Sequence, residues 1–192
     1  MRRELQRLGE TASGASVPSP ASDHFALFGL AKAYDIDAGA LQTRFRELQR
    51  MLHPDRFAQA PAAERSASAF LASRLNEAYA TLRDPLTRAH YFLQLHGIDA
   101  PSAAQAALSA DFLDTQIDWR EDFEAACNAR DRVTLDRLTS ALREETRWRY
   151  DALAEDLKAG AYLSAARLVT ELRFLERLAA DVVEALDRWE MV

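Results

Sequence analysis

The sequence predicts an all-α protein, in which an N-terminal helical hairpin is joined to a C-terminal antiparallel three-helix bundle. Glycine and proline number six each among 192 residues, which is too few for a loop-rich β protein. Ala, Leu, Arg and Glu, all strong helix formers, dominate the composition. Apolar residues recur at helical spacing through most of the chain after residue 22.

The first 22 residues are predicted to be a disordered extension. They end in a stretch of small residues and prolines between Thr11 and Pro20, a composition that cannot build a packed core. Glu4 and Glu10 argue against a transit peptide, and no apolar secretory segment follows.

Residues 23–97 are predicted to form the first domain. A short helix is expected over about 26–34, and a second begins near Ala38 with Asp37 as its N-terminal cap. Four residues at i, i+4, i+7 and i+11 give the second helix one apolar face: Leu41, Phe45, Leu48 and Leu52. Pro54 prevents that helix from continuing far.

A third helix is expected to begin near Pro61, a favourable first-turn residue. It carries six apolar residues at helical spacing: Phe70, Leu71, Leu75, Ala78, Tyr79 and Leu82. Asp84-Pro85 interrupts it, and a further helix over 86–96 is expected to stop at Gly97.

The second half is predicted to be a separate helical bundle. Residues 98–105, with Pro101, are the expected linker, and residues 106–192 the second domain. Helices are expected over 111–129, 132–158 and 162–189. The last shows the alternating 4–3 spacing of an antiparallel seam: Leu168, Leu172, Leu175, Ala179, Val182, Leu186 and Trp189.

Charge separates the two halves. Residues 23–97 carry nine Lys/Arg against eight Asp/Glu, whereas residues 98–192 carry twelve against twenty. The two halves are therefore expected to meet different partners.

The tripeptide His53-Pro54-Asp55 is the strongest candidate for a functional site. It lies between two amphipathic helices, on a turn too polar to bury, where proline holds an imidazole and a carboxylate at a fixed angle. Such a turn suits recognition by another protein. The alternative interpretation is that the tripeptide is a turn that ends a helix and has no other function.

A basic strip adjoins this tripeptide. Arg44, Arg46 and Arg50 lie off the apolar face of the preceding helix, opposed by Glu47, and Arg56 follows the turn. The strip would steer an acidic protein surface; taken alone it also reads as a solvated helix face. Nucleic acid is a poor partner for so short a strip on an acidic chain.

Four segments carry a family resemblance: Asp23-His-Phe-Ala-Leu-Phe-Gly-Leu30, Phe45-Arg-Glu-Leu-Gln-Arg-Met-Leu-His-Pro-Asp-Arg-Phe57, Leu75-Asn-Glu-Ala-Tyr-Ala-Thr-Leu-Arg-Asp-Pro-Leu86 and Arg88-Ala-His-Tyr-Phe-Leu-Gln-Leu-His-Gly97. They are similar to the J-domain of HscB, the co-chaperone of iron–sulfur cluster biogenesis, and the similarity covers nearly all of 23–189. The resemblance implies that the J-domain docks on the DnaK-type chaperone HscA and switches on its ATPase. It also implies that the acidic bundle binds the scaffold protein IscU.

The first helix of the bundle has more apolar residues than one seam needs. Phe112, Trp119, Phe123 and Ala126 form the natural core stripe, whereas Leu113 and Ile117 are rotated about 100° from it. Periodicity alone slightly favours a broader core. The resemblance instead implies a client-binding surface: Leu113, Ile117, Asp118, Glu121 and Phe174. Asp114 replaces an apolar residue common in relatives, so a smaller or more polar surface is expected.

No enzyme, cofactor or metal site is expected. The chain has one cysteine, Cys127, and this count excludes any multi-cysteine site. We interpret Cys127 as a small core residue. His24, His90 and His96 share no short ligand motif and read as core or surface residues. No membrane span is found, and a cytoplasmic location is expected.

Three rival functions stay open. The chain could be a J-domain protein serving another client. The bundle could be an oligomerisation or structural module beside a vestigial J-domain. An iron- or cluster-binding enzyme is the third rival.

Overall fold

The computed structural model describes residues 22–100 and 110–190, and within them every regular element is a helix. The chain falls into two compact units, Met1–Arg88 and Ala89–Val192. The predicted all-α class is confirmed. The predicted extension over 1–22 and most of the predicted linker over 98–105 lie outside the described residues, so these boundaries stay predictions.

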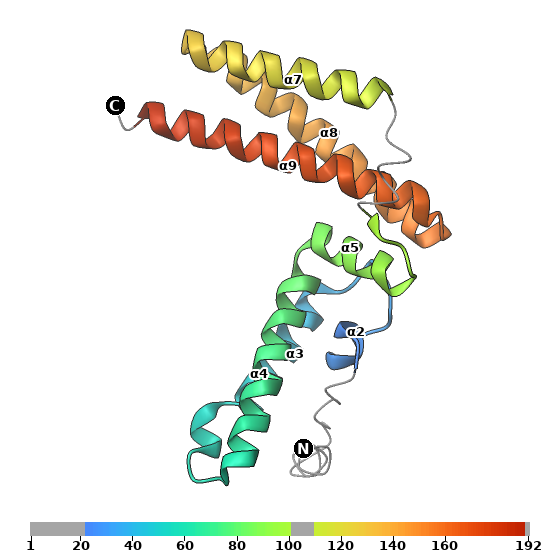
Figure 1. Ribbon diagram of the computed structural model, residues 1–192, viewed down its shortest axis with the longest axis vertical. Coiled ribbons are helices and arrows are strands. Elements are labelled where there is room, and N and C mark those ends of the chain that lie inside the picture. The colour runs from blue at the N-terminus through green and yellow to red at the C-terminus, as the bar shows by residue number, and fades with distance from the viewer. Residues whose placement is uncertain (1–21, 101–109, 191–192) are drawn as a thin grey trace. The chain divides into compact units, whose positions relative to one another are not determined.

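The first unit is built on a helical hairpin. Helix α3 (Ala38–Met51) and helix α4 (Ala62–Arg83) pack side by side, and the short helix α2 (His24–Leu27) packs on α4 (Figure 1). A single 3₁₀ turn, η1 (Pro54–Phe57), connects the hairpin and also contacts α4. The core comes from the predicted apolar faces, including Leu41, Leu48 and Leu75.

Helix α2 is shorter and earlier than the expected helix over 26–34, and that prediction was wrong in its extent. The Asp23 carboxylate accepts a hydrogen bond from the Ala26 N–H at 2.9 Å and so fixes the start. Gly29, at φ +66°, turns the chain out of the helix. Phe70, expected on the apolar face of α4, is instead 48% exposed.

Helix α5 (Pro85–Leu95) spans the division between the two units. Asp84 caps its start by accepting a hydrogen bond from the Thr87 N–H at 2.7 Å. Gly97, with φ +75°, follows its end, as predicted.

The second unit contains three long helices, α7 (Ala110–Ala129), α8 (Arg132–Ala159) and α9 (Tyr162–Glu190). Helices α8 and α9 form the most extensive pairing, and α7 packs on both, more on α8 (Figure 1). A cluster of buried side chains from all three helices forms one core: Ala126, Leu135, Leu138, Leu142, Leu175, Leu178, Val182 and Ala185.

Candidate functional site

The His-Pro-Asp tripeptide forms the start of η1. His53 is its N-cap: the ring Nδ1 accepts a hydrogen bond from the Asp55 N–H at 3.3 Å and lies 3.6 Å from Asp55 Oδ2. The Arg56 N–H donates to the His53 carbonyl at 3.0 Å. The His53 side chain is 56% exposed and that of Asp55 is 91% exposed. The turn is therefore internally hydrogen-bonded, yet the His53 and Asp55 side chains remain open to solvent.

One buried hydroxyl fastens this turn to the hairpin. Ser68, in α4 and 2% exposed, donates to the Leu52 carbonyl at 3.1 Å. That carbonyl lies at the end of α3, where a helix has no backbone donor left to offer. Beside the turn is an open hollow lined by Gln49, Arg50, Leu52, His53, Pro54, Ala72, Leu75 and Asn76. The turn thus presents a concave surface together with its two polar side chains.

Sequence reasoning missed Ser68 and the part of the hollow that α4 supplies. Ser68 precedes the buried Leu71 and Leu75 by three and seven residues, so it lies on the core stripe of α4. A hydroxyl residue on a core stripe is a readable signal, because a buried hydroxyl needs a partner.

The predicted basic strip has one paired and three unpaired members. Arg44 donates to Glu47 at 3.1 Å, so this arginine is neutralised within α3. Within the described part of the chain, Arg46, Arg50 and Arg56 form no ion pair, and all three are exposed. The positive charge available to a partner therefore comes from these three residues.

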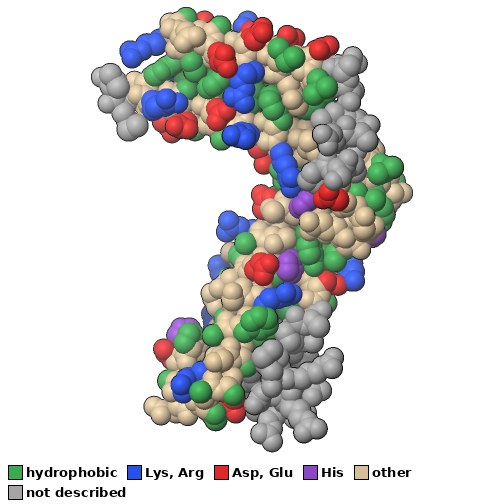
Figure 2. Space-filling model, viewed as in Figure 1, with side chains coloured by type: hydrophobic (Ala, Val, Ile, Leu, Met, Phe, Trp, Pro, Cys, Tyr) green, Lys and Arg blue, Asp and Glu red, His purple; other side chains and the backbone are tan. Residues whose placement is uncertain are grey.

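The predicted client surface, defined here as Leu113, Ile117, Asp118, Glu121 and Phe174, lies on α7 and α9. Its two aliphatic members are strongly exposed for apolar side chains, at 44% for Leu113 and 56% for Ile117. Asp118 and Glu121 are exposed as well, and so is Asp114. Figure 2 shows acidic, basic and hydrophobic side chains interspersed over the visible face of the second unit.

Phe174 joins the α9 side of this surface to α7. Its ring lies edge-on to Phe112 at 6.1 Å and stacks on Trp119 at 6.5 Å. Arg120 of α7 also bonds Asp181 of α9 at 3.1 Å. Phe174 is consequently half-buried, which leaves part of its ring for a partner. Whether these five residues bind a client stays a prediction.

The remaining candidate features are a metal site, a reactive cysteine and a membrane-spanning helix. In residues 22–100 and 110–190, no three His, Cys, Asp or Glu side chains come together as a metal site. Burial raises the pKa of the Cys127 thiol, which disfavours its reactive thiolate. None of the helices in the same ranges is long and apolar enough to cross a membrane.

Comparison with known proteins gives consistent similarities over the chain. Residues 108–183 match the family model described as the HSCB C-terminal oligomerisation domain. A co-chaperone protein HscB homolog from Ralstonia nicotianae is 44% identical, over 88% of this chain and 97% of the relative.

Two solved structures extend the comparison to the fold. The chaperone HscB from Vibrio cholerae matches with a TM-score of 0.77 at 32% identity, over 87% of this chain and 99% of that one. Human co-chaperone protein HscB matches with a TM-score of 0.80 at 25% identity, over 90% of this chain and 86% of that one.

Taken with the exposed His-Pro-Asp turn, these similarities define the class as the J-domain co-chaperones. The chain belongs to the HscB family, because it is 44% identical to an HscB homolog over nearly the whole of that relative.

Proposed function

We propose that this chain stimulates the ATPase of the DnaK-type chaperone HscA and delivers the iron–sulfur scaffold protein IscU to it, in the cytoplasm and without catalytic chemistry of its own. The observation that carries the proposal is the exposed, internally hydrogen-bonded turn at His53-Pro54-Asp55. A turn already held in one conformation loses little entropy when a partner binds it.

Electrostatics supports a chaperone as the partner of this turn. Arg46, Arg50 and Arg56 leave three uncompensated positive charges close to it in the sequence. Such charges accelerate encounter with an acidic surface and orient the two proteins before contact. Arg44 contributes less, because Glu47 already neutralises it.

The predicted client surface supports the second half of the proposal. Leu113 and Ile117 expose apolar area on α7 that the bundle itself does not use. Asp118 and Glu121 are exposed nearby and would add polar contacts at the rim of an interface. Carrying both surfaces on one chain raises the effective concentration of the client at the chaperone.

The chaperone end is tested by steady-state ATP hydrolysis of purified HscA. We expect His53→Gln to reduce the stimulation by about tenfold or more, a loss of roughly 1.4 kcal/mol of coupling, while IscU binding is unchanged. His96→Gln, at the other exposed histidine, is the matched control and should stimulate normally. Full stimulation by His53→Gln would refute the role of the turn.

The client end is tested by titrating labelled IscU. The variant Leu113→Ala/Ile117→Ala/Phe174→Ala should bind about tenfold more weakly and lose only the IscU-dependent part of ATPase stimulation. A matched control truncates exposed apolar residues elsewhere on the bundle, Val133→Ala/Leu163→Ala. Equal binding by all three proteins would point to another client.

Self-association is a second candidate for the bundle, favoured by the description of the family model that matches residues 108–183. Sedimentation of the purified chain with and without IscU separates the two functions. A defined oligomer that dissociates when IscU binds would indicate that both use one surface. A monomer that forms a one-to-one complex with IscU would rule out self-association, and client binding would be the remaining function.

A further inference from the structure

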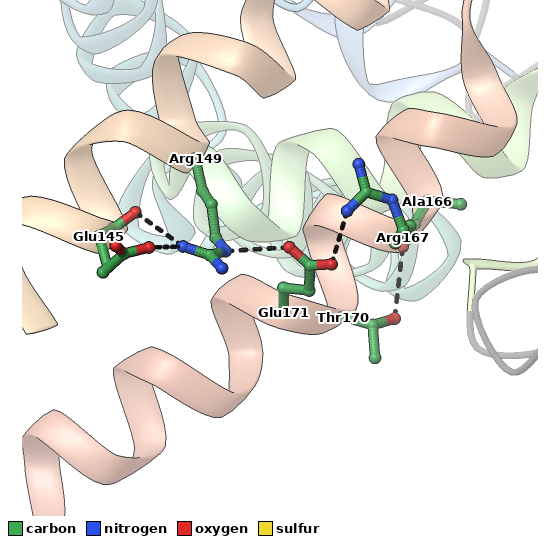
Figure 3. Close-up of polar contacts among 6 residues, drawn as sticks. All are labelled: Glu145, Arg149, Ala166, Arg167, Thr170 and Glu171. Atoms are coloured by element: carbon green, nitrogen blue, oxygen red, sulfur yellow. Dashed lines mark hydrogen bonds and ion pairs between the residues drawn. The ribbon is translucent and has the colours of Figure 1, made fainter. Parts of the chain in front are cut away.

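The second unit buries an ion pair between α8 and α9. The Arg149 Nε donates to Glu171 Oε2 at 2.9 Å, and a second nitrogen of Arg149 bonds Glu145 on the same helix (Figure 3). Arg167 donates to the other oxygen of Glu171 at 2.7 Å. Arg149 is 8% exposed and Glu171 is 1% exposed. Both charges are therefore largely removed from water and paired with oppositely charged side chains.

Stability alone gives no reason for such a pair. Removing two charges from water costs roughly as much as their attraction returns, and well-packed apolar residues of similar size often serve as well or better. Arg149 and Glu171 occupy positions on the apolar seams of α8 and α9, next to the buried Leu153 and Leu172. A charge pair there provides a directional contact that an apolar pair lacks.

The pair also reaches the third helix. The Arg149 guanidinium lies over the ring of Phe112 in α7, 5.0 Å from its centroid. The same ring also packs against Phe174 in a T-shaped arrangement, with the ring centroids 6.1 Å apart. The Phe112 ring thus contacts both a buried cation on α8 and a member of the predicted client surface on α9.

Phe112 anchors the start of α7. Among the described side chains of residues 112–118, Phe112 alone is buried. The neighbouring Leu113 and Ile117 are 44% and 56% exposed. The position of Phe112 therefore helps to set where Leu113 and Ile117 are presented.

We propose that Arg149 is a positioning residue for client capture. Held by Glu171 and Glu145, it fixes the Phe112 ring and sets the first turns of α7 against Phe174, so that both sides of the client surface form one binding site. This inference rests on the proposed client function. Because Arg149 is 8% exposed, its proposed effect on the client acts through Phe112.

The test separates positioning from stability. Arg149→Met leaves Glu171 with Arg167 as its remaining cation and should lower the urea midpoint. The double variant Arg149→Met/Glu171→Leu replaces the pair by apolar side chains and should recover the midpoint. We expect the double variant to bind IscU about tenfold more weakly than wild type despite this recovery. Arg188→Met, which removes an exposed pair with Glu184 on α9, is the control and should change neither quantity.

Hydrogen exchange provides a readout that needs no client. In the double variant, amides of the first two turns of α7 should exchange at least about tenfold faster, while those of α8 and α9 stay protected. HscA stimulation without IscU should equal that of wild type, because the turn at His53 is untouched.

Each outcome decides the proposal. If the double variant regains affinity together with stability, or if exchange rises evenly over the bundle, Arg149 is merely structural and the proposal is wrong. Localised exchange with weak binding supports it. If Leu113→Ala/Ile117→Ala/Phe174→Ala binds IscU as wild type does, the proposed client function fails instead, and hydrogen exchange still tests the link to α7.

Discussion

Ser68 and His24 show how single buried polar groups shape the first unit. Ser68 satisfies the Leu52 carbonyl at the end of α3 and thereby fixes where the His-Pro-Asp turn begins. His24 is 8% exposed on α2. Burial lowers the pKa of its imidazole below the ordinary 6.5, Arg74 adds to the lowering, and Glu77 opposes it.

The His24 environment predicts that stability depends on pH. A histidine whose pKa is lowered by folding takes up its proton more readily in the unfolded chain, so stability is complete above the unfolded pKa of 6.5 and falls as the pH drops below it. Burial lowers the pKa of His90 too, which acts in the same direction. Urea midpoints at about pH 7.5 and 5.5 should therefore differ in wild type and differ less in His24→Gln. An equal difference in the two proteins would contradict this.

At the scale of elements, periodicity predicted the long helices well, because each long helix buries one continuous stripe. The start of α8 at Arg132 and the start of α9 at Tyr162 agree with expectation. The short helix α2 was misplaced, because four residues contain too little periodicity to detect. Its boundaries come from the cap at Asp23 and the positive φ of Gly29; both residue types are visible in the sequence as signals that start or end a helix.

Helix α8 is capped at its C-terminal end by Gly160, whose left-handed backbone conformation is one that only glycine adopts without strain. Gly160 has φ +74°, and an added Cβ would meet nothing within 4 Å, so the cost of Gly160→Ala is conformational alone. We expect about 1 kcal/mol of lost stability in urea unfolding. Gly160→Asn, whose side chain tolerates this conformation better, should lose less. Equal stability of Gly160→Ala and wild type would show that the connection rearranges.

Over the whole molecule, the sequence predicted the exposed turn but not the network beneath the second surface. His53-Pro54-Asp55 is local, so three consecutive residues suffice to find it. Arg149 and Glu171 are 22 residues apart on two helices, and only the folded bundle pairs them. The sequence does place charged residues of opposite sign at positions on the apolar seams of neighbouring helices. Such residues predict a buried ion pair, but they do not show which of them are paired.

The proposed function, with a chaperone site and a client site on one chain, makes a prediction about the intact chain. In that proposal, chains carrying His53→Gln keep only the client site, and chains carrying Leu113→Ala/Ile117→Ala/Phe174→Ala keep only the chaperone site. Mixed together, they should leave IscU-dependent ATPase stimulation about tenfold below wild type, because effective concentration requires both ends on one chain. Wild-type stimulation by the mixture would contradict this and would indicate mixed oligomers.

The hydrogen bond inside the His-Pro-Asp turn also decides the tautomer of His53. Because Nδ1 accepts from the Asp55 N–H, the neutral ring carries its hydrogen on Nε2. The edge offered to a partner is then a donor, and the complementary group is an acceptor such as a carboxylate or a backbone carbonyl. Beside Asp55, which only accepts when ionised, the turn presents one donor and one acceptor in fixed order. A partner surface that reverses this order would find both groups mismatched.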